Sequence, residues 1–129
     1  TPALLEAAIQ DRDDSMLWWD DNIELLFDVT GRNDGEFYHY IVSARNTVAD
    51  FKGKDLAWNG DAVRTAVFIG PDYWSAEVFV PFAAFAEAAK PVGGSASQVQ
   101  WYGNFTRHRV CAWGLKPRAA PGQPRRGSF

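Results

Sequence analysis

The sequence lacks the main features of disulfide-bonded, membrane and nucleic-acid-binding proteins. Its single cysteine, Cys111, cannot form an internal disulfide, and no second cysteine completes a metal-thiolate site. No stretch approaches the ~18 apolar residues of a membrane span. A net charge of -3 provides no basic surface for nucleic acid. We therefore expect no nucleic-acid partner and no membrane partner.

The sequence also lacks the motifs of common enzyme classes. It contains no GxGxxG or GxxxxGK[ST] phosphate-binding loop and no GxSxG nucleophile elbow. Its two histidines, His39 and His108, stand in no recognisable motif. We therefore expect a protein that is not an enzyme and has no catalytic residues.

Aromatic residues are abundant. They make up 15% of the chain and include six tryptophans. Tryptophan is too large to be fully buried often, so we expect at least one indole ring to meet solvent or a ligand. The length fits a single domain over 1–129, and the Pro- and Arg-rich segment 114–129 predicts an irregular tail.

Short segments with alternating apolar and polar residues are bounded by Gly, Asn, Asp and Pro, which is typical of antiparallel strands. The predicted strands cover residues 22–29, 36–43, 46–51, 62–69, 73–80 and 99–108, with a further run at 110–113. The Ala-rich segment 82–89 predicts a short helix or helical turn, and residues 2–10 could form a short helix by propensity. The chain is thus expected to be all-β, an antiparallel immunoglobulin-like or jelly-roll-like sandwich with one short helix.

Four carboxylates stand in tandem on loops near the start of the chain: Asp13, Asp14, Asp20 and Asp21. Calcium takes several carboxylate and carbonyl oxygens from such loops, so these four residues are candidate metal ligands. The alternative is that they are solvated turn residues.

Trp18 and Trp19 directly precede the first predicted strand. Neighbouring residues at a strand end point in opposite directions, so one indole should pack inward and the other outward. Trp18 could offer a flat apolar surface to a pyranose ring, with Glu24, Asn46 or Asn104 bonding to its hydroxyls. The alternative is that both indoles pack in the core or at its rim.

An ordered series of motifs supports a family resemblance. It consists of Asp13-Asp14, Trp19-Asp20-Asp21-Asn22-Ile23-Glu24, the 38–43 strand, Trp58-Asn59-Gly60, Trp74-Ser75-Ala76-Glu77, Pro81-Phe82, Asn104-Phe105-Thr106-Arg107 and Trp113. Between residues 11 and 113 this order and spacing resemble carbohydrate-binding module family 9 and the related DOMON-like β-sandwiches.

The resemblance implies a non-catalytic carbohydrate-binding β-sandwich, extracellular or periplasmic, that directs a larger secreted protein to polysaccharide or sugar ends. It also implies covalently linked neighbouring domains and structural calcium. Trp18 matches a sugar-stacking tryptophan of the family, and Glu24 matches an acidic residue that hydrogen-bonds the sugar. The family's basic sugar contact falls on Ile41 and its asparagine partner on Ser43, and no tryptophan follows Trp113 as a second stacking ring. The family also has strand-rich sequence before the acidic tryptophan motif, so we expect a fragment lacking the N-terminal strands.

Two alternative functions remain. Related sandwiches hold b-type haem, and an electron-transfer domain could use Met16 with His39 or His108 as axial ligands. The second alternative is a degenerate sandwich that serves as a structural or interaction domain.

The remaining matched residues predict packing rather than binding. Arg107 and Glu77 are expected to form a buried or rim ion pair, because an unpaired charge near a core is costly. Strand alternation places Glu77 on the face opposite Trp74. The predicted core aromatics are Trp74, Phe82, Trp101 and Phe105.

Overall fold

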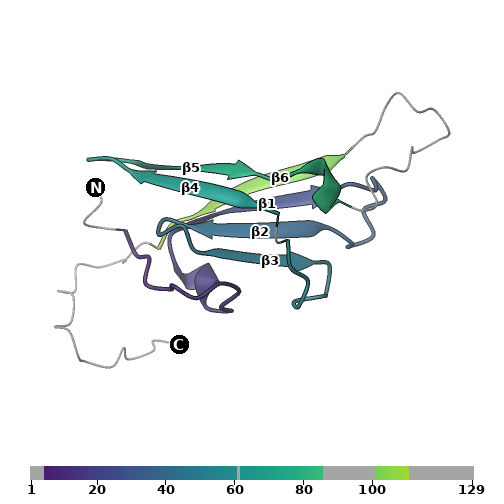
Figure 1. The fold of residues 1–129 in the computed structure, drawn as a ribbon, viewed down its shortest axis with the longest axis horizontal. Coiled ribbons are helices and arrows are strands. Elements are labelled where there is room, and N and C mark those ends of the chain that lie inside the picture. Colours follow the sequence, from purple (N-terminus) through teal and green to yellow (C-terminus); the bar gives the residue numbers. More distant parts are fainter. Residues whose placement is uncertain (1–4, 61, 86–100, 111–129) are drawn as a thin grey trace.

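The computed structural model describes residues 5–60, 62–85 and 101–110. Within them the chain is all-β, as the sequence predicts (Figure 1). The strands are β1 (Asn22–Asp28), β2 (Tyr38–Ser43), β3 (Val48–Lys52), β4 (Arg64–Ile69), β5 (Trp74–Phe79) and β6 (Tyr102–His108). Some predicted positions lie outside the described residues: 2–4 and 86–89 of the two predicted helices, 99–100 of the strand 99–108, 111–113 of the run that follows it, and the tail 114–129.

The strands form two antiparallel sheets. One has the order β3-β2-β1-β6, and the other pairs β4 with β5. Each strand differs from its predicted range only at the ends. The last strand, β6, pairs with the first, so β1 lies between β2 and β6 (Figure 1).

The inner face of the four-stranded sheet packs toward β4 and β5. Tyr38 and Tyr40 are buried there, and Val63 and Val80, which flank the two-stranded sheet, pack against their cluster. The guanidinium of Arg107 on β6 lies 5.8 Å from a ring centre of Trp74 on β5. These contacts make the fold a two-layered sandwich.

The outer face of the same sheet is covered on its β2–β3 side by the N-terminal segment. The 3-10 turn η2 (Leu17–Trp19) places Leu17, which is fully buried, against Ile41, Ala49 and Phe51. Apolar residues of β2 and β3 are thus covered on both faces, which explains why these two strands are almost completely buried.

The helix predicted over 2–10 is wrong for the described residues 5–10, which form no helix. The backbone N–H groups of Ala8 and Ile9 donate to the carboxylate of Asp20, at 3.0 and 2.9 Å. These donors therefore bond to a side chain distant in the sequence rather than to a preceding helical turn. The predicted helix over 82–89 begins as the short 3-10 turn η3 (Phe82–Ala84).

Two predicted core aromatics are exposed. Phe82 and Phe105 expose 77% and 68% of their surface, while Trp74 and Trp101 are half-buried. Phe105 points to the inner face, so the two-stranded sheet leaves this part of β6 uncovered. The predicted Arg107–Glu77 ion pair is also wrong, because Glu77 lies on the exposed face of β5 and Arg107 contacts the ring of Trp74 instead.

The helical segments of the described chain are the 3-10 turns η2 and η3, and neither is long enough to cross a membrane.

Candidate functional site

Three of the four residues predicted to bind sugar lie on the outer face of the four-stranded sheet. Glu24 on β1 is in register with Ile41, which packs in the outer cluster, and Asn104 on β6 is in register with Leu26, the next outward residue of β1. The side chain of Trp18 packs against the same face. Register and packing thus bring together three residues separated by up to 86 positions in the sequence.

Trp18 is held by ring stacking. Its indole lies against the ring of Phe51 on β3, with centroids 5.2 Å apart and planes at 6°. One indole packs inward and the other points outward, as predicted, but the cause is a 3-10 turn rather than a strand end. Within this turn Leu17 is buried, Trp18 is half-buried and Trp19 is 66% exposed. Trp19 is therefore the more exposed of the two indoles, and sequence reasoning assigned it no role.

Glu24 is positioned by a histidine that sequence reasoning did not assign to the sugar site. The Nε2 atom of His39 lies 2.8 Å from Oε2 of Glu24. The His39 ring also lies 6.1 Å from that of Trp18 and 5.8 Å from that of Phe51. Among the described residues no hydrogen bond engages Oε1 of Glu24, which leaves this oxygen to accept one from a ligand. Alternation could have placed each of these residues on an outward face of its strand, but their contact also depends on the register of β1 against β2.

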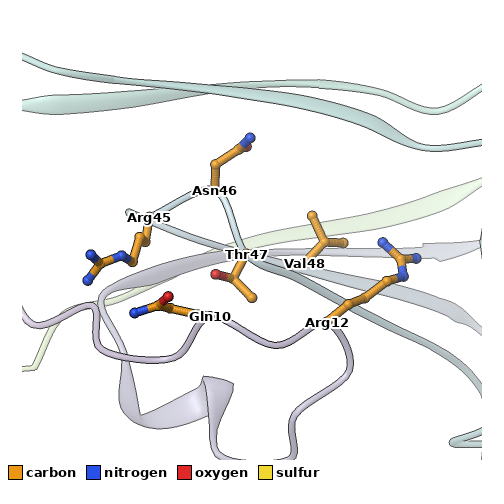
Figure 2. A pocket seen from close by; sticks show the side chains of 6 residues that line it. All are labelled: Gln10, Arg12, Arg45, Asn46, Thr47 and Val48. Carbon is orange, nitrogen blue, oxygen red and sulfur yellow. The ribbon is translucent and has the colours of Figure 1, made fainter.

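Asn46 lies apart from the other three candidates. It adopts a left-handed conformation (φ 64°) in the turn between β2 and β3, whereas Phe51, on which Trp18 stacks, is near the opposite end of β3. A pocket of about 380 Å³ opens at this turn (Figure 2). Figure 2 shows the Asn46 side chain pointing away from the N-terminal segment that forms the other wall. The pocket is lined by Gln10, Arg12, Arg45, Asn46, Thr47 and Val48.

Asp13 and Asp14 bond to nearby protein groups. Oδ1 of Asp13 accepts the backbone N–H of Asp50 at 3.2 Å, and Oδ2 lies 3.4 Å from Nε of Arg12. Oδ1 of Asp14 accepts the backbone N–H of Met16 at 2.7 Å. These contacts tie the loop to β3 and start the η2 turn.

Asp20 and Asp21 are buried and fasten distant backbone segments to the start of β1. Each uses both carboxylate oxygens, and together they accept bonds of 2.8 to 3.1 Å from the N–H groups of Glu6, Ala8, Ile9 and Val110. Across the described part of the chain, no three His, Cys, Asp or Glu side chains gather in a way that could hold a metal ion. Calcium binding by the four aspartates remains a prediction.

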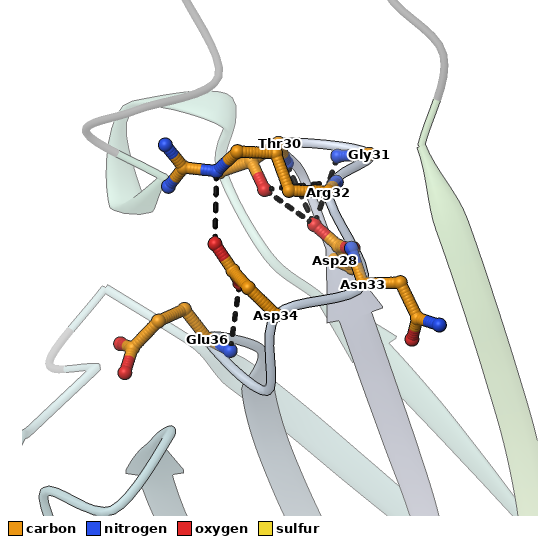
Figure 3. Close-up of polar contacts among 7 residues, drawn as sticks. All are labelled: Asp28, Thr30, Gly31, Arg32, Asn33, Asp34 and Glu36. Carbon is orange, nitrogen blue, oxygen red and sulfur yellow. Dashed lines mark hydrogen bonds and ion pairs between the residues drawn. The ribbon is translucent and has the colours of Figure 1, made fainter.

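Asp28 ends the outward row of β1, in register with Tyr102. Burial by itself raises the pKa of this carboxyl, but hydrogen bonds from Asn33, Thr30 and Gly31 outweigh it and hold the pKa below its usual value. Figure 3 shows these donors surrounding the carboxylate at 2.8 to 2.9 Å. Asp28 thus stabilises the β1–β2 connection, and its oxygens are already engaged.

The candidate haem ligands make protein contacts. Nε2 of His39 is bonded to Glu24, and Nδ1 of His108 lies 2.7 Å from the carbonyl oxygen of Trp18. Met16 is exposed. No contact among these residues favours haem over sugar.

Comparisons with protein-family models, with curated proteins and with solved structures find no match to this chain. Any functional assignment therefore depends on the residues and on their geometry.

Proposed function

We propose that this chain is a non-catalytic carbohydrate-binding domain that uses the outer face of its four-stranded sheet. The observation that carries the proposal is the convergence of Trp18 and Glu24 on His39, at 6.1 Å between ring centroids and 2.8 Å between polar atoms. An aromatic ring beside a hydrogen-bonding carboxylate suits a sugar, which has apolar C–H faces and polar edges.

Both groups are held before a ligand arrives. Trp18 is stacked on Phe51, and Glu24 is restrained by His39 while one of its oxygens stays unengaged within the described structure. Side chains that are already ordered lose less conformational entropy on binding. Weak contacts with hydroxyl groups can then yield measurable affinity.

Further polar groups lie beside this pair. Asn104 and Thr106 are exposed on β6, and Thr106 is in register with Glu24. An amide and a hydroxyl can each donate and accept, as recognition of sugar hydroxyls requires. The family resemblance adds the proposal that the domain belongs to a larger secreted or periplasmic protein that acts on polysaccharide.

The test is titration calorimetry against a panel of neutral oligosaccharides, with calcium and again with a chelator. We expect Trp18→Ala to weaken a measured affinity by about tenfold or more, which corresponds to 1.4 kcal/mol. Trp19→Ala is the matched control, because it removes an adjacent indole that does not contact Phe51 or His39 within the described structure. Unchanged affinity in Trp18→Ala would exclude Trp18 as the stacking ring.

A second candidate function is that of an interaction domain. It is favoured by the large apolar side chains that β4 and β5 expose, among them Phe68 and Phe79. The same titrations separate the two functions. A folded protein that binds no glycan, with or without calcium, supports the interaction domain.

A further inference from the structure

Alternate residues of β6 form a continuous row on the outer face. The row, called here the β6 strip, consists of Tyr102, Asn104, Thr106 and His108, and all four are exposed. Successive strand residues rise ~3.4 Å, so six steps extend over roughly 20 Å. A row of this length exceeds what one sugar ring can cover.

Aromatic groups stand at both ends of the strip. Tyr102 exposes 53% of its surface at one end. At the other end His108 bonds to the carbonyl oxygen of Trp18, so this residue of the η2 turn adjoins the strip there. Between the ends lie the amide of Asn104 and the hydroxyl of Thr106. Stacking surfaces at the ends and hydrogen-bonding groups in the middle suit several linked sugar rings.

The charge of the strip favours a neutral ligand. The amide of Asn104 and the hydroxyl of Thr106, in the middle of the strip, are not ionisable. The two acids on the neighbouring row of β1 are already engaged: Glu24 faces His39 at 2.8 Å, and Asp28 accepts hydrogen bonds from the β1–β2 connection. The strip therefore offers a hydroxyl-rich chain hydrogen bonds without a strong attraction for charged groups.

The strip is also open. Its four side chains are exposed along the whole row, whereas the pocket of Figure 2 lies at the β2–β3 turn. Among the described residues the row stays exposed to its last residue at both ends, and a surface of this kind does not select a chain terminus. We propose that the β6 strip binds an internal stretch of a linear neutral polysaccharide, running from Tyr102 toward Trp18, rather than a free sugar end. This inference rests on the proposed carbohydrate-binding function and specifies its ligand.

The first experiment varies chain length and chain end. Cello-, xylo-, manno- and laminari-oligosaccharides of increasing length are titrated, each also after borohydride reduction of its terminal sugar. We expect affinity to rise by about tenfold or more from the monosaccharide to the tetrasaccharide, as added contacts accumulate, and to survive reduction. Equal affinity for the monosaccharide, or loss of binding on reduction, would overturn the strip while leaving carbohydrate binding intact. If no sugar of any length binds, the proposed function itself fails.

The second experiment locates the ligand on β6. Tyr102→Ala should weaken tetrasaccharide binding by about tenfold and leave monosaccharide binding unchanged, because Tyr102 lies at the far end from Trp18. Phe105→Ala is the matched control, since Phe105 is also an exposed aromatic residue of the same strand but points to the opposite face. Asn104→Ala provides a second variant within the strip. Equal loss in Tyr102→Ala and Phe105→Ala, or no loss in either strip variant, would contradict the proposal.

Discussion

The β2–β3 and β4–β5 pairs are both antiparallel, have strands of similar length and contain aromatic and β-branched residues, yet they differ sharply in burial. Nearly every residue of β2 and β3 is buried, whereas β4 and β5 contain no buried residue. The cause lies outside the strands. The N-terminal segment covers the outer face of β2 and β3, and their inner face packs against residues flanking β4 and β5.

Packing covers only one face of the β4–β5 pair in the described structure. On the other face Phe68 is 57% exposed, and Phe79 is exposed at the far end. A two-stranded sheet with little burial is marginally stable by itself. Coverage by other layers, rather than strand composition, therefore determines which half of this sandwich supplies the stability.

Truncation of one apolar side chain in each sheet tests directly how much stability each sheet supplies. Ile41 is fully buried on β2 between β1, β3 and the η2 turn. Ile41→Ala should lower the free energy of unfolding by about 4 kcal/mol, because it removes buried methyl groups and leaves a cavity. Phe68→Ala, which deletes a larger side chain from β4, should cost less than about 1 kcal/mol. Chemical denaturation of the two variants measures both values, and similar losses would show that the two sheets contribute equally.

Another test concerns Asp50, a buried carboxylate within the well-packed β2–β3 pair. Asp50 on β3 is fully buried, accepts the N–H of Gly60 at 2.8 Å and pairs with Arg12. Burial, followed by the charge of Asp50, raises the pKa of the neighbouring Tyr40 hydroxyl, which stays neutral. Asp50→Ala should cost about 3 kcal/mol, since it leaves partners of the carboxylate without their acceptor.

The control for that experiment is the exposed ion pair of Asp34 with Arg32, at 2.9 Å. Asp34→Ala should cost less than about 1 kcal/mol, because solvent screens exposed pairs. Thermal unfolding of both variants gives the comparison. A small loss in Asp50→Ala would mean that the N-terminal segment is not fastened to β3 through this carboxylate.

Sequence reasoning predicted the strands and their faces well, because alternation reports directly which side chains share a face. The separation of Tyr38 and Tyr40 from His39 and Ile41 is confirmed. Alternation cannot report what covers a face, and for this reason Phe105 was predicted to be in the core. Alternation also does not indicate which strands are neighbours in the sheet.

The candidate site shows the same limit. The contact between His39 and Glu24 requires the register of β1 against β2, and Asn104 joins the site only because β6 pairs with β1. The backbone bonds of Asp20 and Asp21 connect residues that are distant in sequence, so no local pattern reveals them. The sequence could suggest the residue types of a sugar site but could not determine which of them lie together.

The β1–β2 connection belongs to the well-packed half but is exposed, like the β4–β5 pair. A substitution there should change the free energy of unfolding only slightly. Asp28→Asn should lower the free energy of unfolding at neutral pH by about 1 kcal/mol, because an amide nitrogen replaces one of the two accepting oxygens. The folded state holds the pKa of Asp28 below its usual 3.8. Its stabilisation is therefore present above pH 3.8 and is lost as the pH falls through the lowered folded value.

The difference between the original protein and Asp28→Asn should accordingly shrink on acidification, which denaturant titrations from neutral pH to below 3.8 can follow. Asp34→Asn, in the same connection, is the matched control, and it alters the contacts of Asp34 with the Glu36 N–H at 3.1 Å and with Arg32. If the difference for Asp28→Asn stays constant down to the lowest pH, the hydrogen bonds of Figure 3 do not favour the ionised carboxylate. The connection would then resemble β4–β5 in stability as well as in exposure.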